Sequence, residues 1–322
     1  MAMSVIDSSP APVATPSPAP VSARPPLRRS NTFWRVLPLY LSVAPFYLLF
    51  AIFGLFPLCF SLYLAFHKWD GIGAMKYVGW NQFAYLLTDT YFWQAIVNTL
   101  EIWLLATLPM IGISVVLAFL LASPLVQRKG FYRVAFFLPH ITSVVAIALV
   151  FGSLFSNQFG LLNALLTSLG LSRIAWLSQP WSMKIAIATM ILWRSIGYHA
   201  LIFMAGIQSI PVSLNEAARI DGAKSTQIFF HITLPLLRPI MLFTIVTSTI
   251  SGMQVFTEPQ VLLGNDGGPG RAGMTIVLYL YQQAFGSYHF GYGAAIGWGL
   301  FVVIVLFSLL NWLLVQRPGR RA

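Results

Sequence analysis

Residues 215–235, NEAARIDGAKSTQIFFHITLP, form a polar stretch between two long apolar runs. The stretch crowds charged residues together in a chain that is 57% hydrophobic and only 8% charged. Soluble domains carry about 25% charged residues, so most of this chain is too apolar to fold in water alone. The composition therefore predicts a membrane protein, and it predicts that this stretch lies outside the hydrocarbon core.

Six apolar segments are long enough to cross a bilayer as helices, which takes about 20 residues. They are residues 38–66, 95–122, 135–155, 185–208, 236–257 and 294–315. Two shorter apolar pieces, 159–171 and 274–285, fit interfacial or re-entrant helices better. The pattern predicts an all-α membrane domain of six transmembrane helices over residues 33–316.

The two ends of the chain differ from this domain. Residues 1–32 are rich in Pro, Ala and Ser and are predicted to be disordered, because such a segment buries too little apolar surface to order itself. Residues 317–322 are predicted to form a basic C-terminus.

The Lys and Arg residues predict the orientation. With the N-terminus in the cytoplasm, thirteen of the nineteen fall on the inner side and five on the outer side. Both termini and residues 209–235 are then cytoplasmic. This distribution also explains the net charge of +11 without nucleic acid as a partner.

Residues 209–235 have the pattern of two short helices. Ser213 and Glu216 have the spacing of a capping box at a helix start. Gly222 is placed to end that helix in a left-handed conformation. A second helix is predicted from about Ser225, and Pro235 returns the chain to the membrane.

Two interpretations of this helix pair remain open. An amphipathic connector would lie on the lipid headgroups. A rigid knob would fit a socket on a cytoplasmic partner. Ala217 and Ala218 favour the knob, because their small side chains form a face that another surface can approach closely.

The same residues carry a family resemblance. Glu216-Ala217-Ala218, then Gly222 after three residues, then Ile232-x-Leu234-Pro235 after nine more, resembles the EAA loop of permease subunits of bacterial binding-protein-dependent ATP-binding-cassette importers. The flanking sequence is similar to the sugar branch of that family, which includes maltose-type and glycerol-3-phosphate-type permeases. Three further stretches agree with it: FYRVAFFLPH, NQFGLLNALL with WLSQP, and LLGNDGGPGRAGMTIVLYLYQQAF. The likeness covers about residues 33–316.

The resemblance implies a permease of the MetI-like fold in the bacterial inner membrane, working as one half of a permease pair. Its implied partners are a cytoplasmic ATPase dimer, a second permease subunit, an extracytoplasmic solute-binding protein and the lipid bilayer. The EAA loop would be the coupling helix pair that docks on the ATPase.

The resemblance also implies roles for single residues. Glu216 would contact the ATPase socket and Gly222 would form the bend, while Ala217 and Ala218 would allow close approach. Arg219 and Asp221 would make charge-assisted bonds at the rim. Ile232, Leu234 and Pro235 would set the return to the membrane.

The chain shows no pattern for chemistry of its own. A phosphate-binding loop needs G-x4-G-K-[ST], and the chain contains no Gly-Lys dipeptide, so the glycine-rich GNDGGPGRAG is interpreted as an extracytoplasmic turn. ATP and magnesium are therefore expected on separate ATPase subunits, with no cofactor on this chain. The five histidines have no metal-ligand spacing, and no nucleophile–base arrangement is visible, so no metal site and no enzyme activity are predicted.

Arg194 and Glu101 lie inside predicted spans, where a charge costs about 2.5–3.5 kcal/mol near the helix centre. Such groups either form a structural ion pair, for which these two are candidates, or hydrogen-bond a polar solute. In the family, the deep solute site can belong to only one permease of a pair. Weaker candidates for the same pathway are Asn98, His199, Gln254 and Glu258.

The sequence thus predicts a permease subunit of an ATP-driven importer for a sugar or oligosaccharide. The nearest alternative is the same machine importing glycerol-3-phosphate or a polyol derivative. A secondary carrier driven by an ion gradient would show inverted repeats, and no clear internal repeat is visible. A structural membrane scaffold would leave the charges within the spans unexplained.

Overall fold

The computed structural model describes residues 32–123 and 126–315. The predicted disordered tail lies outside this range except for Thr32, which begins the first helix, and the predicted basic C-terminus lies wholly outside it. The chain divides into two compact units, residues 1–56 and 57–322, which are described separately.

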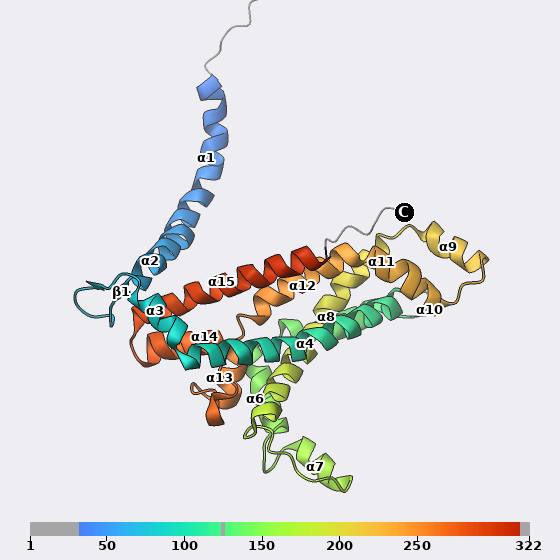
Figure 1. Cartoon of the computed structure of the whole chain (residues 1–322). Coiled ribbons are helices and arrows are strands. Elements are labelled where there is room, and N and C mark those ends of the chain that lie inside the picture. Colours follow the sequence, from blue (N-terminus) through green and yellow to red (C-terminus); the bar gives the residue numbers. More distant parts are fainter. Residues whose placement is uncertain (1–31, 124–125, 316–322) are drawn as a thin grey trace, which may run out of the picture. The chain divides into compact units, whose positions relative to one another are not determined.

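The described part is almost entirely helical (Figure 1). Its elements in chain order are α1 (Thr32–Phe50), the π-helical turn η1 (Ala51–Leu55), α2 (Phe56–Ala65), β1 (His67–Lys68), β2 (Lys76–Tyr77), α3 (Asn81–Thr88), α4 (Thr90–Ala122), α5 (Lys129–Ile141), α6 (Val144–Leu154), α7 (Leu161–Ser168), α8 (Pro180–Gln208), α9 (Val212–Ile220), α10 (Ser225–Ile228), the π-helical turn η2 (Phe229–Thr233), α11 (Leu234–Leu236), α12 (Arg238–Gly252), α13 (Thr257–Leu263), the 3-10 turn η3 (Pro269–Arg271), α14 (Ile276–Tyr281), the π-helical turn η4 (Gln282–Gly286) and α15 (Phe290–Val315). The predicted helical fold is confirmed, with one two-stranded hairpin added.

Four helices are long and apolar enough to cross a membrane, at Tyr40–Ala65, Thr90–Ala122, Pro180–Gln208 and Phe290–Leu313. Two further pairs qualify only if each bent pair counts as one span. These are α5 with α6, bent by 90°, and the segment Ser225–Leu236 with α12, bent by 65°. The described residues therefore hold four to six spans.

The prediction of one continuous span over residues 135–155 is wrong. Thr142 and Ser143 have extended ψ angles of 147° and 125°, so the helix stops and restarts in a new direction. Hydropathy cannot reveal this break, because the apolar run continues on both sides. The fifth span is also shorter than predicted, since α12 ends at Gly252.

In the first unit, α1 passes into the π-helical turn η1. Its side chains from residue 40 onward are almost all exposed and apolar, including Tyr40, Phe46 and Phe53. Such a surface suits lipid rather than water.

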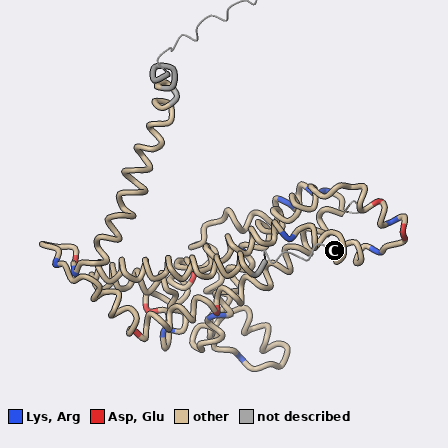
Figure 2. The backbone as a smooth tube through the Cα atoms, turned by 45° about the horizontal axis from the view of Figure 1, so that its top comes forward, with Lys and Arg blue, Asp and Glu red and all other residues tan. Residues whose placement is uncertain are grey.

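In the second unit, α4 packs along α8, and α12 packs against both α4 and α15. Figure 1 shows α9, α10 and α11 at one end of this bundle, with the β1–β2 hairpin, α3 and α14 at the other. Charged residues gather at these two ends, and only a few lie between them (Figure 2).

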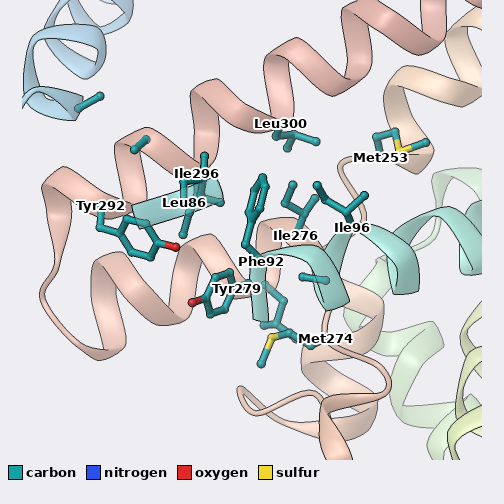
Figure 3. Packing of buried hydrophobic residues seen from close by; sticks show 14 of the residues in the cluster. Leu86, Phe92, Ile96, Met253, Met274, Ile276, Tyr279, Tyr292, Ile296 and Leu300 are labelled. Carbon is teal, nitrogen blue, oxygen red and sulfur yellow. The ribbon is translucent and has the colours of Figure 1, made fainter. Parts of the chain in front are cut away.

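The hairpin end holds the largest cluster of buried apolar residues, shown in Figure 3. Asp89, which caps α4, is buried within reach of two tyrosines there. Its carboxylate accepts hydrogen bonds from the Tyr91 N–H at 2.9 Å and from the Tyr279 hydroxyl at 2.5 Å, and a further one from the Tyr292 hydroxyl. Burial and this carboxylate raise the pKa of Tyr279 above its ordinary value, so the phenol remains a donor. Asp89 thereby joins α4, α14 and α15.

Close approach of α5 and α8 depends on Gly197. A Cβ built there would lie 1.7 Å from the Phe136 carbonyl oxygen. We expect Gly197→Ala to lower the free energy of unfolding by about 1–3 kcal/mol or more, because backbone must move. The thermal unfolding midpoint of the detergent-solubilised protein measures this.

Gly112→Ala is the matched control, since a Cβ in that part of α4 has no atom within 4 Å. Alanine also favours a helix interior by about 1 kcal/mol over glycine. Equal destabilisation by the two substitutions would contradict the close packing at Gly197.

Candidate functional site

Residues 209–235 are here called the coupling loop, after the role that the family resemblance implies, and their first half contains the exposed helix α9. Its end is closed by two hydrogen bonds, from the Gly222 N–H to the Arg219 carbonyl at 3.1 Å and from the Ala223 N–H to the Ala218 carbonyl at 2.9 Å. Gly222 has φ +80°, the left-handed conformation that glycine adopts without strain. This is the Schellman ending of a helix, and the bend predicted at Gly222 is confirmed.

The predicted capping box is wrong. Helix α9 begins at Val212 after Pro211, so Ser213 already lies in its first turn, and no side chain caps the helix start. Glu216 is therefore not engaged at the helix start and is exposed. None of the nine residues of α9 is buried, including Ala217, Ala218 and Arg219, and Asp221 after it is exposed.

The second half of the coupling loop is anchored in the bundle. The Gln227 side chain accepts from the Lys224 N–H at 2.7 Å and opens α10 at Ser225 as predicted. Ile228 is buried, and Ile232, Leu234 and Pro235 are partly buried. Phe229 and Leu234 pack against a cluster made by α4, α8 and Leu237. The loop thus joins an exposed helix to a fixed base.

A central cavity of about 260 Å³ lies among α4, α6, α8, α12 and the following segment. Its lining includes Arg194, His199, Gln254 and Glu258, four of the six predicted pathway residues. The structure adds hydroxyl groups that the sequence reading missed, from Thr107, Ser195, Ser248, Ser251 and Thr257.

Arg194 and Glu101 each form an ion pair, but with other partners rather than with one another as the sequence suggested. Arg194 donates to Glu258 at 3.3 Å, and the side chain of Glu258 is only 6% exposed. Glu101 instead pairs with Lys184, across α4 and α8. The pairing of Arg194 with Glu101 is therefore wrong, since each has a nearer partner of opposite charge.

His199 is buried in the wall of the central cavity. Its Nδ1 lies 2.9 Å from the Ser195 carbonyl, and its Nε2 lies 3.3 Å from the Ser248 hydroxyl. These contacts hold the ring between α8 and α12.

Asn98 lies outside this cavity. It is buried, and its amide donates to the Arg271 and Met274 carbonyls at 2.9 and 3.1 Å. Asn98 thus fastens the glycine-rich loop between α13 and α14 to α4. Among the structure's described residues, no group of three or more His, Cys, Asp or Glu side chains could hold a metal ion.

Two important residues were missed in the sequence. Lys184 lies just before the predicted span 185–208, yet α8 begins at Pro180 and Lys184 is buried in its second turn. Proline at a helix start is a signal that could have moved this boundary. Asp89 was likewise passed over, although an Asp directly before an apolar helix is a typical N-cap.

Comparison with known proteins defines the class of this chain. Residues 114–320 match the family described as "Binding-protein-dependent transport system inner membrane component". The chain belongs to this family, whose members are transport subunits, and it is a multi-pass inner-membrane protein with the MetI-like permease fold. Membership decides against the secondary carrier and the scaffold.

Particular relatives are similar over nearly the whole chain. The arabinooligosaccharides transport system permease protein AraP of Bacillus subtilis (strain 168) is 36% identical, over 84% of this chain and 86% of its own. The lactose transport system permease protein LacF of Rhizobium radiobacter is 34% identical, over 85% and 92%. A chain of a bacterial transporter that imports the acidic polysaccharide alginate superposes with TM-score 0.76 and 26% identity, over 90% of this chain and 98% of its own.

The Arg194–Glu258 pair can be tested by substitution. Glu258→Gln leaves Arg194 without its counter-charge, and we expect it to lower the free energy of unfolding by about 1–3 kcal/mol. Adding Arg194→Gln should recover part of that loss, because the double variant has no uncompensated charge. Denaturant titration in detergent measures both.

The same Glu→Gln change at exposed Glu216 is the control and should leave stability unchanged. If the double variant loses as much unfolding free energy as Arg194→Gln and Glu258→Gln together, the two side chains do not interact.

Proposed function

We propose that the coupling loop docks on a cytoplasmic ATPase subunit and turns ATP-driven closure of an ATPase dimer into gating of the membrane helices. The observation that carries this proposal is the exposed apolar surface of α9. Val212, Leu214 and Ile220 are 67%, 44% and 86% exposed, beside the acidic Glu216 and Asp221. A short helix with no buried residue, such as α9, has the surface of a docking element. The second half of the coupling loop is anchored in the bundle and can transmit movement of α9 to α12.

The other partners follow from the same reading. A second permease subunit completes the pathway, and an extracytoplasmic solute-binding protein delivers the solute at the end that carries the hairpin. ATP and magnesium belong to the ATPase, and this chain catalyses no reaction and binds no cofactor. Both termini are then cytoplasmic, on the side of the coupling loop.

The solute is a sugar or oligosaccharide that passes the central cavity. Supporting this are relatives whose names specify arabinooligosaccharides and lactose, and a structural neighbour titled as an alginate importer. The hydroxyl, amide and imidazole groups of the cavity suit a solute with many hydroxyl groups. The Nε of Arg194 is buried without a partner among the described residues and is available to such a solute.

Charge at the central cavity gives no preference for glycerol-3-phosphate. A phosphate ester would be favoured by an unpaired cation, and Arg194, which lines this cavity, is paired with the Glu258 carboxylate.

The coupling role is tested by Gly222→Val. A β-branched side chain is strained at φ +80°, so the bend should shift and α9 should lose its docking position. We expect membrane insertion to be preserved and ATP-driven uptake in proteoliposomes of the assembled transporter to fall at least about tenfold, which corresponds to about 1.4 kcal/mol of coupling.

Gly170→Val is the matched control. Gly170 has φ +74° and ends α7 with the same pattern of two hydrogen bonds, from its own N–H to the Thr167 carbonyl at 3.0 Å and from the Leu171 N–H to the Leu166 carbonyl at 2.9 Å. Helix α7 lies away from the coupling loop (Figure 1). Normal uptake with Gly222→Val, or an equal loss with Gly170→Val, would refute a specific coupling role.

A further inference from the structure

A second cavity, here called the hairpin cavity, lies at the end of the bundle away from the coupling loop. Its volume is about 880 Å³, within the range of about 300–1,000 Å³ typical of small-molecule sites. The β1–β2 hairpin, α3, the start of α4, the η3 turn and the junction of η4 with α15 form its walls. None of the predicted pathway residues lines it.

Aromatic rings supply much of its surface. Tyr85, Tyr91 and Tyr288 are 58%, 49% and 62% exposed, and Trp69 is held by an Nε1–H bond to the Gly73 carbonyl at 3.1 Å. Exposed rings on a fixed frame can stack against the C–H face of a sugar ring, because the ring face is electron-rich. Amide groups of Asn81, Gln82 and Gln283 stand beside them.

The cavity is also positively charged. Lys68, Lys76 and Arg271 line it, against a single lining carboxylate, Asp70. None of the three cations forms an ion pair within the described ranges. The Arg271 guanidinium lies 4.1 Å from the centre of the Tyr91 ring, which orients it without neutralising it.

The hairpin holds two of these charges in an arrangement that costs stability. Lys68 and Lys76 are direct cross-strand partners in the antiparallel pair. Like charges facing each other across a hairpin are destabilising. A carboxylate bound between them would relieve the repulsion.

Backbone strain gathers at the same place. Among the described residues, three other than glycine have positive φ, and two of them, Arg271 at 56° and Tyr288 at 57°, line the hairpin cavity. Such conformations persist only where surrounding contacts impose them, and they cluster at ligand sites. Here α4 imposes one of them, since Gln94 and Asn98 donate to the Gly270 and Arg271 carbonyls, each at 2.9 Å.

We propose that the hairpin cavity binds a saccharide unit that carries a carboxylate, with the ring against the tyrosines and the acid group on Lys68, Lys76 and Arg271. This inference rests on the proposed function. It assigns selection of solutes by charge to the hairpin cavity, because the cation of the central cavity is already paired with a carboxylate. Glycerol phosphate would supply the anion but no ring to stack. The volume of about 880 Å³ is that of a small-molecule site.

Calorimetric titration of the full-length chain in nanodiscs of zwitterionic lipid tests the proposal. The probes are trigalacturonate, the neutral maltotriose and glycerol-3-phosphate. We expect trigalacturonate to bind at least about tenfold more tightly than either of the others.

Lys68→Gln with Lys76→Gln should weaken trigalacturonate binding about tenfold, as loss of two exposed charge contacts implies. The same variant should keep or raise the unfolding temperature, which a merely structural role would not allow. Arg173→Gln removes an exposed cation that does not line this cavity, and should bind normally.

Equal binding of maltotriose or glycerol-3-phosphate, no binding of trigalacturonate, or unchanged binding by the double variant would each overturn the proposal. Saccharide uptake by the assembled wild-type transporter shows whether a negative binding result concerns the hairpin cavity alone or the proposed function as a whole. Saccharide uptake without binding at the hairpin cavity refutes this inference alone, whereas absence of any saccharide uptake refutes the proposed function itself.

Discussion

Pairing of charge inside apolar helices is the constraint on which the rest of this structure depends. A charged group costs several kcal/mol within a membrane unless another group compensates it. Arg194 with Glu258 and Lys184 with Glu101 meet this requirement by joining segments far apart in the chain. Each pair therefore fixes how α8 lies against its neighbours, and the Arg194 pair also forms the polar wall of the central cavity.

The two ends of the second unit use their polar residues differently. At the hairpin end, Asp89 is buried and ties three helices together through tyrosine hydroxyls, so that end is rigid. At the coupling loop, Glu216 and Asp221 are exposed on a helix that buries nothing. This difference suits a subunit that is moved by a partner at the exposed helix α9 and receives its solute at the opposite, firmly joined end.

Between these ends, the bundle provides a neutral polar cavity rather than a charged one. The charges of its Arg194–Glu258 ion pair cancel, and its hydroxyl groups include those of residues in α4, α8 and α12. Selection by charge, where it occurs, then belongs to the unpaired cations of the hairpin cavity. Under the two proposals, the hairpin cavity recognises the charge of a solute and the central cavity recognises its hydroxyl groups.

Local patterns in the sequence were enough to predict the apolar helices, the bend at Gly222 and the family resemblance of Glu216-Ala217-Ala218. These features depend on neighbours along the chain: hydropathy over about 20 residues, and a left-handed turn that glycine alone adopts freely. Tertiary structure decided which charges pair, that Asn98 fastens a distant loop, and that Lys68, Lys76 and Arg271 share one cavity. It also decided the 90° break at Thr142 and Ser143. The ion pairs and the Asn98 contacts join residues far apart in the chain, 64 residues for the Arg194–Glu258 pair and 173 for the Asn98–Arg271 bond, and no local pattern encodes such contacts.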